Sequence, residues 1–111
     1  ENNEVVLVDT GTLAIAKRIR MKGKNPEHAV WSPDGKQLYV SAEEADSVDI
    51  IDVARAEVVK SVKVGDRPRG IGFLPDGTRA FVAAENADVV NVFDTATNDV
   101  IARIKAGRFE P

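Results

Sequence analysis

The chain has 111 residues, of which 43% are hydrophobic and 30% are charged, and this balance indicates a globular protein. Its 15 basic and 18 acidic residues are mixed along the chain, so no basic stripe follows a phosphate backbone and we do not expect nucleic acid as a partner. The lack of cysteine excludes disulfides, thiolate metal sites and thiol nucleophiles. No apolar run reaches the roughly 20 residues that span a bilayer, so no membrane span is expected.

Residues 1–23 carry two β-rich runs and no complete repeat. Val5–Thr10 matches Val48–Val53 further along the chain, and Ile15–Gly23 matches Val58–Gly65 with one extra residue. Both matching segments belong to the second half of a longer repeated unit. We therefore interpret this first segment as a half unit that contains two strands.

Residues 24–65 and 66–107 are two copies of one 42-residue unit, and residues 108–111 begin the next linker. Aligned without gaps, the two copies share fifteen identities. Several of the remaining positions keep the character of the side chain, and the aromatic positions correspond as Trp31 with Phe73 and Tyr39 with Phe81. Because an aromatic residue that recurs at the repeat period usually packs inside, we expect all four to belong to the core.

Inside each unit, short runs rich in Val, Ile, Tyr and Phe are separated by turn residues, and no helical period is sustained. We predict four strands per unit, which in the last copy lie at 70–74, 79–84, 89–94 and 99–106. Pro75-Asp76-Gly77 predicts a tight turn after the first strand, because Pro fixes φ and Gly accepts a positive φ. Asp94–Asn98 predicts the last turn, with side chains that bond the turn's own backbone.

Four short antiparallel strands in a 42-residue unit fit one blade of a β-propeller. A lone sheet of this size would leave both faces exposed, whereas radially stacked sheets bury each face against the next one. A β-sandwich also uses short strands but gives no reason for a sequence repeat. The predicted fold class is therefore all-β, with about two and a half four-stranded antiparallel blades.

Three segments resemble the YVTN repeat family of seven-bladed β-propellers, namely Leu38–Ser41, Ser47–Asp52 and Val62–Gly70. The chain is also similar to propeller proteins associated with PQQ-dependent alcohol catabolism. Because two and a half blades do not close a ring, the resemblance implies a fragment of a seven-bladed propeller, and a periplasmic or extracellular protein. Exposed blade edges invite strand pairing between molecules, so we also expect self-association.

In propellers of this type, the loops that lead into the first strand of a blade share one face of the ring with the loops between the second and third strands. We call this the loop face, and we expect a protein or small ligand to bind there. Its candidate contact residues are Glu27, His28, Glu43, Glu44, Asp46, Arg67, Arg69, Glu85, Asn86 and Asp88.

His28 is the only histidine, and it stands where the next blade has Gly70. The functional interpretation is haem or metal ligation, as in the propeller of cytochrome cd1 nitrite reductase, which the repeat distantly resembles. A single His without Cys or a second His makes a poor transition-metal site. We therefore favour a surface polar role for His28.

The charged candidates also have two interpretations each. Glu43, Glu44 and Asp46 have the carboxylate chemistry of a calcium site, but the corresponding trio of the next blade keeps only two acids, which favours solvated turn formers. Arg67 and Arg69 have the geometry to hold an anion bidentately. We favour ion pairs between these arginines and Glu43 or Glu44 of the neighbouring blade.

No nucleophile elbow, phosphate-binding loop or zinc-protease pattern occurs in the chain, and no serine has a base at a readable spacing. We therefore predict no catalytic residue, no cofactor and no metal, and we expect a non-enzymatic binding or scaffold module. Two alternatives remain open. In the first, the chain is a segment of a propeller enzyme, lactonase-like or haem d1 nitrite reductase-like. In the second, it is a segment without independent function.

Overall fold

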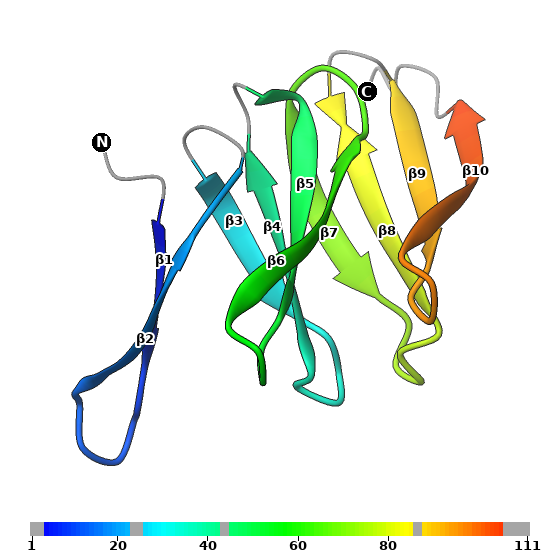
Figure 1. Cartoon of the computed structure of the whole chain (residues 1–111). Helices are drawn as coiled ribbons and strands as arrows, with labels where there is room; N and C mark the ends of the chain where they lie inside the picture. The colour runs from blue at the N-terminus through cyan, green and yellow to red at the C-terminus, as the bar shows by residue number, and fades with distance from the viewer. Residues whose placement is uncertain (1–3, 23–25, 43–44, 86–87, 106–111) are drawn as a thin grey trace, which may run out of the picture.

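The computed structural model describes residues 4–22, 26–42, 45–85 and 88–105, apart from the side chains of Ile15 and Glu27. Within these residues the chain forms ten β-strands (Figure 1). Their bounds are Glu4–Val8 (β1), Ile15–Arg20 (β2), Pro26–Trp31 (β3), Gln37–Ala42 (β4), Ser47–Asp52 (β5), Glu57–Lys63 (β6), Pro68–Phe73 (β7), Arg79–Ala84 (β8), Val89–Asp94 (β9) and Asp99–Lys105 (β10).

The strands form three antiparallel sheets that follow one another along the chain (Figure 1). The first sheet contains β1 and β2, and each of the other two is a four-stranded meander, β3–β6 and β7–β10. This arrangement confirms the all-β fold class with a half blade followed by two whole ones. The predicted unit boundaries at residues 23, 65 and 107 stay predictions.

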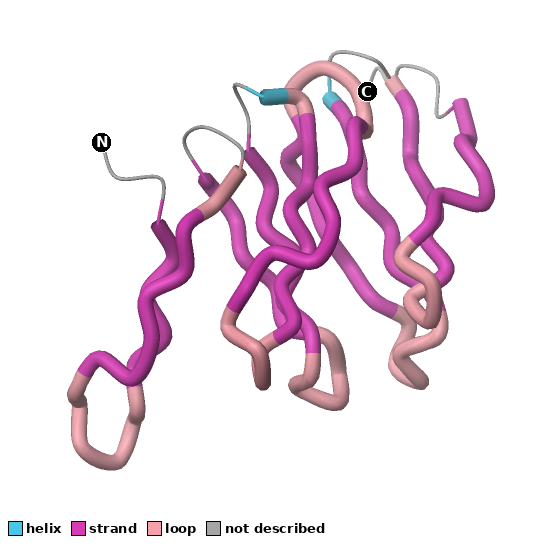
Figure 2. The backbone as a smooth tube through the Cα atoms, in the orientation of Figure 1, coloured by secondary structure: helices cyan, strands magenta, loops and turns pink. Residues whose placement is uncertain are grey.

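Turns that connect neighbouring strands of a sheet lie together at one end of the sheets (Figure 2), and Asp side chains recur in their hydrogen bonds. In the first turn of each whole blade, Asp34 and Asp76 accept a backbone N–H two residues later at 2.9 Å. These hydrogen bonds, from Lys36 and Thr78 respectively, hold the pKa of both carboxyls below its ordinary value. The turn prediction at Pro75-Asp76-Gly77 is thus confirmed, and Gly77 has the expected positive φ of 77°.

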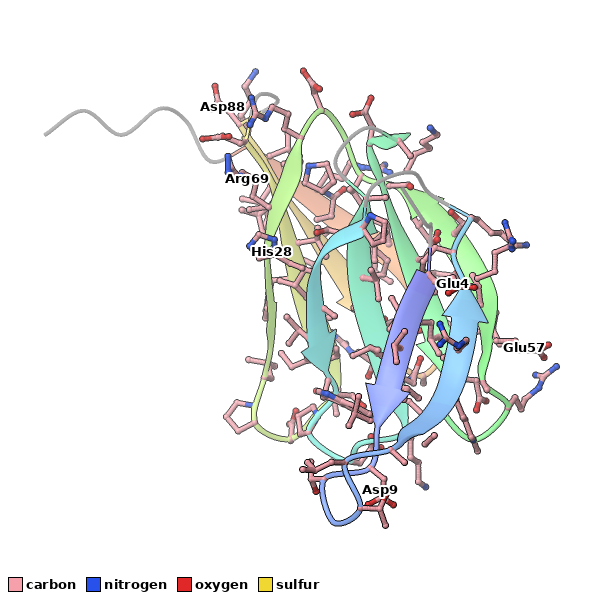
Figure 3. The ribbon with its side chains drawn as sticks, turned by 90° about the vertical axis from the view of Figure 1, so that its left-hand side faces the viewer. Glu4, Asp9, His28, Glu57, Arg69 and Asp88 are labelled. Carbon is pink, nitrogen blue, oxygen red and sulfur yellow. The ribbon has the colours of Figure 1, made fainter. Side chains whose placement is uncertain are left out.

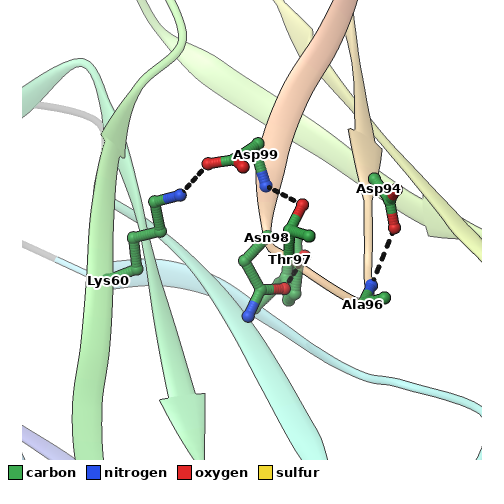
Figure 4. Close-up of polar contacts among 7 residues, drawn as sticks. Lys60, Asp94, Ala96, Thr97, Asn98 and Asp99 are labelled. Carbon is green, nitrogen blue, oxygen red and sulfur yellow. Dashed lines mark hydrogen bonds and ion pairs between the residues drawn. The ribbon is translucent and has the colours of Figure 1, made fainter.

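The last turn of each sheet begins with an Asp that accepts a backbone N–H of the turn, and all three turns close with the same backbone hydrogen bond. Asp94 accepts the N–H of Ala96 at 2.9 Å and Thr97 accepts that of Asp99 at 3.3 Å, as Figure 4 shows. The turn closes with a residue of positive φ whose N–H bonds the carbonyl four residues earlier. The residues in this position are Leu13, Ala56 and Asn98.

The two whole blades pack face to face around Tyr39. Its side chain is fully buried, and its ring meets those of Phe73 and Phe93 edge-on, with centroids 5.0 and 5.5 Å apart. Val48 and Ile50 of the first whole blade complete its side of this cluster. Burying one such side chain contributes about 1.5–3 kcal/mol, so this interface stabilises both sheets.

The half blade packs on the opposite face of the sheet β3–β6. Ile19 and Met21 form a second cluster with Leu38, Val40 and Ile51. Val5 and Leu7 of β1 and Val58 of β6 pack against this cluster. Each of the two interfaces between neighbouring sheets therefore has an apolar cluster of its own, as stacked blades require.

The prediction that Trp31 belongs to the core is wrong, because its side chain is 50% exposed. Its counterpart Phe73 is covered by Tyr39, which lies on the second strand of the preceding sheet. The sheet that precedes Trp31 contains only β1 and β2, which correspond to the third and fourth strands of a blade. Trp31 therefore lacks the neighbour that covers Phe73.

Candidate functional site

Loops from both whole blades gather at the end of the sheets opposite the Asp turns (Figures 1 and 2). Backbone hydrogen bonds fix these loops to one another. The N–H of Val64 bonds the carbonyl of Asp46 at 3.0 Å, and the N–H of Glu85 bonds the carbonyl of Arg67 at 2.9 Å. The linker between the two blades is thus anchored to the second-to-third-strand loop of each, as the definition of the loop face requires.

Arg69 lies at a β-bulge at the start of β7, because the register shifts between Pro68 and Gly70. Bulges re-aim side chains at sheet rims. Here the Arg69 guanidinium reaches Glu85 at 3.2 Å, and Arg67 lies 3.9 Å from the same carboxylate oxygen. The side chains are about half exposed, so each pair contributes at most about 1 kcal/mol.

In the described part of the chain, these arginines contact the carboxylate of Glu85 in their own blade. The sequence favoured ion pairs with Glu43 or Glu44 of the neighbouring blade. Those two residues lie outside the described residues. The reason for the contact with Glu85 is local, since β7 and β8 are adjacent strands and Glu85 directly follows β8.

Asp46 and Asp88 occupy corresponding positions with φ values of 56° and 52°. Asp tolerates this left-handed conformation better than most residues, because its short polar side chain can bond locally. Both are half-buried. Their recurrence at a strained turn favours the structural interpretation over a calcium site.

His28 lies within β3 rather than in a loop, opposite Ser41 of β4. The hydroxyl oxygen of Ser41 accepts its backbone N–H at 3.3 Å, and the residue is exposed. Figure 3 shows His28 and Arg69 toward the same margin of the molecule. Among the described residues, no three His, Cys, Asp or Glu side chains are grouped as a metal site would require.

The structure describes only part of the remaining candidate residues. The backbone of Glu27 belongs to β3 at a bulge that corresponds to that of Arg69, but its side chain is not described. Glu43, Glu44 and Asn86 lie outside the described residues. The structure therefore brings together Arg67, Arg69 and Glu85 from the predicted set.

Sequence reasoning missed two buried polar residues that connect neighbouring blades. Asp49 accepts the N–H of Lys22 at 2.7 Å and a hydrogen bond from Ser61 at 2.6 Å. Its counterpart Asn91 donates to the carbonyl of Val64 at 2.8 Å. Each side chain thus holds the segment that follows the last strand of the preceding blade. A polar residue inside an apolar strand, repeated after 42 positions, was the available signal.

A cleft of about 540 Å³ lies between the two whole blades at the end opposite the loop face. Gln37 and Thr95 line it and are joined by a hydrogen bond of 3.1 Å from the Gln37 amide to the Thr95 carbonyl. The turn residues Asp34 and Asp76 also contribute, but their carboxylates are already engaged by turn hydrogen bonds. This cleft therefore follows from the turns and carries no separate reactive group.

A family model described as YNCE-like beta-propeller matches residues 1–109. The chain belongs to this family. The resemblance to repeat propellers and the fold class are thereby confirmed for nearly the whole of this YNCE-like chain. No curated protein matches its sequence.

Solved propeller structures resemble the YNCE-like chain over most of its length. Hydrazine synthase of Kuenenia stuttgartiensis matches 98% of it with a TM-score of 0.89 and 33% identity. Dihydro-heme d1 dehydrogenase NirN matches 93% at 0.80 and 19% identity. Apo AztD from Citrobacter koseri matches 94% at 0.76 and 24% identity. The last two show the fold alone.

The YNCE-like chain spans less than a third of each of these proteins, namely 31%, 22% and 29% of their chains. It thus corresponds to a part of a propeller, as its incomplete first sheet also indicates. No helix among its described residues is long and apolar enough to cross a bilayer.

Proposed function

We propose that the chain is a non-enzymatic binding or scaffold segment of a periplasmic or cell-surface propeller protein, and that a protein or small ligand binds at the loop face. One observation carries the proposal. Most residues that the two repeats share form turns and blade interfaces, whereas several loop-face positions change in charge between blades, as from Glu27 and His28 to Arg69 and Gly70.

The electrostatics of the described loop face support a polar partner. Arg67 and Arg69 both approach the carboxylate of Glu85, at 3.9 and 3.2 Å. Because the side chains of Arg69 and Glu85 are about half exposed, their ion pair contributes little to stability and costs little to break. A ligand that brings a carboxylate or another anion can therefore compete with Glu85 for a bidentate arginine contact.

The test is a binding experiment with the full-length protein. We expect charge reversal by Arg69→Glu to reduce capture of the partner from a periplasmic extract at least tenfold. The matched control is Arg55→Glu, because Arg55 is an exposed arginine paired with Glu57 at the opposite end of the sheets. Equal capture by both variants, or turnover of a small substrate that Arg69→Glu abolishes, would contradict the proposal.

The alternative is a segment of a propeller enzyme. Two of the similar structures support this alternative, because they are enzymes by their names, a hydrazine synthase and a dihydro-heme d1 dehydrogenase. His28 is the residue that discriminates, since it is the only histidine and is exposed on β3. An activity or a haem spectrum of the full-length protein that is lost in His28→Ala would favour the enzyme over the binding module.

A further inference from the structure

A groove of about 390 Å³ lies between the last strands of the two whole blades, β6 and β10. Each of these strands ends a complete four-stranded sheet, so the groove belongs to the interface between whole blades. Its lining includes Lys60 and Lys63 on β6 and Arg103 on β10. Cationic side chains from two blades therefore share one hollow, whose volume lies in the range of small-molecule sites.

Arg103 is held in this groove by a fully buried side chain. Its Nε donates to the side-chain oxygen of Asn91 at 2.9 Å. The amide nitrogen of Asn91 in turn donates to the carbonyls of Val64 and Val82, so the acceptor has a fixed orientation. One terminal nitrogen of Arg103 makes only a long contact of 3.5 Å, to the carbonyl of Lys63. The guanidinium is thus oriented from its inner side, and its terminal nitrogens can donate to a ligand with two oxygens.

The preceding blade shows that the buried residue does not itself require an arginine. There Ser61 donates to Asp49 at 2.6 Å, and in both blades the two residues are direct cross-strand partners. A short neutral side chain therefore satisfies the buried position of that blade. Arg103 stands beside a neutral amide instead, and none of the described carboxylates pairs with it. Its charge is thus presented to the groove without being neutralised.

The second cation available in the groove is Lys63. Its ammonium group donates to the carbonyl of Ala45 at 2.7 Å, which leaves its charge and its other N–H groups in place. Asp99 also lines the groove, but it is already paired with Lys60 (Figure 4). Arg103 lies four residues further along β10, which is about 13 Å at the rise of an extended strand. The acid and its lysine therefore occupy one end of the groove, away from Arg103.

We propose that this groove binds a small phosphomonoester through its phosphoryl group, with Arg103 and Lys63 as the contacts. Two cations balance the dianion, the arginine takes two of its oxygens, and the lysine acts as a point charge on a third. A planar carboxylate offers the same groups only two oxygens and one charge. The site is separate from the loop-face arginine Arg69, because β7 lies three strand spacings from β10, or about 14 Å.

Calorimetric titration of the full-length protein with inorganic phosphate and with glycerol 3-phosphate, at constant ionic strength, tests the proposal. We expect saturable binding of both probes, with the ester at least as tight. Arg103→Ser installs the residue of the preceding blade, keeps a donor for Asn91, and is expected to weaken binding about tenfold. The matched control is Arg18→Ser, because Arg18 holds the corresponding position on β2 and pairs with Glu4 at 3.5 Å. We expect this control to bind as the unmodified protein does.

Several outcomes would overturn the proposal. Absence of saturable binding removes the site, and equal weakening by Arg18→Ser and Arg103→Ser reduces it to a general effect of charge. Loss of binding in Arg69→Glu would move the site to the loop face.

Two further comparisons test the ligand and the second contact. Tighter binding of free phosphate than of the ester, or of the dicarboxylate succinate than of either, would contradict the assigned ligand class. Lys63→Gln is the second variant, for the case that Arg103→Ser does not fold. We expect it to weaken binding several-fold, and unchanged affinity in this variant would overturn the proposal as well.

Discussion

Tyr39 is the only tyrosine of the chain, and it connects the two whole blades through both its ring and its hydroxyl. The ring is enclosed by Phe73 and Phe93, and the hydroxyl donates to Asn98. Burial, with the nearby charge of Asp94, raises the pKa of Tyr39 well above its ordinary value of 10.0. The neutral phenol is therefore the form that the folded protein holds.

This residue gives a dependence on pH with a definite sign. Above about pH 10 the unfolded chain loses the phenolic proton while the folded chain keeps it, so the free energy of unfolding falls by up to about 1.4 kcal/mol per pH unit. Tyr39→Phe removes this term and costs about 1 kcal/mol at neutral pH through the lost hydrogen bond. Urea unfolding of both proteins at neutral and at high pH measures the difference. An identical pH dependence in the two would contradict the assignment.

At the scale of elements, the connection between blades depends on polar side chains inside the third strands. Asn91 is fully buried and donates to the carbonyls of Val64 and Val82 at 2.8 and 3.2 Å, while Arg103 donates to its oxygen at 2.9 Å. Replacement by an apolar residue leaves the carbonyl of Val64 without this donor. The strand and the preceding linker are therefore stabilised together.

We expect Asn91→Leu to lower the free energy of unfolding by about 1–3 kcal/mol, because buried acceptors lose their partner. Asn91→Asp is the matched comparison, since it keeps the shape but points a carboxylate at the same carbonyls. It should destabilise at neutral pH at least as strongly. Chemical denaturation of the three proteins checks both values, and a neutral Asn91→Leu would show that the side chain does not hold the linker.

The elements themselves were predictable where repeat and turn chemistry agree. The bounds of β8 and β9 are those that the sequence predicts, and the turns Pro75-Asp76-Gly77 and Asp94–Asn98 fix the start of β8 and the end of β9. The predicted start of β7 was two residues late, since Pro68 begins the strand and a bulge follows it. A gapless repeat shows the period but not a bulge that recurs in every copy.

At the scale of the whole molecule, the sequence predicts stacked blades, but the burial that it predicts is wrong where the stack is incomplete. Trp31 and Phe73 occupy the same position in the repeat, yet their burial differs because only Phe73 has a second strand of a preceding sheet beside it. On the loop face, the contact of Arg67 and Arg69 with Glu85 was likewise not predictable. Ion pairs between long side chains depend on the direction in which a β-bulge points each side chain, and a single sequence does not show this direction.

The face-to-face packing of the two whole blades is the central feature of the molecule, and nuclear Overhauser contacts from the ring of Tyr39 test it most directly. With one tyrosine in the chain, its ring signals are unambiguous. The structure predicts contacts to the rings of both Phe73 and Phe93, at centroid distances of 5.0 and 5.5 Å. Contacts from Tyr39 that are confined to residues of its own sheet, β3–β6, would contradict the stacked-blade arrangement.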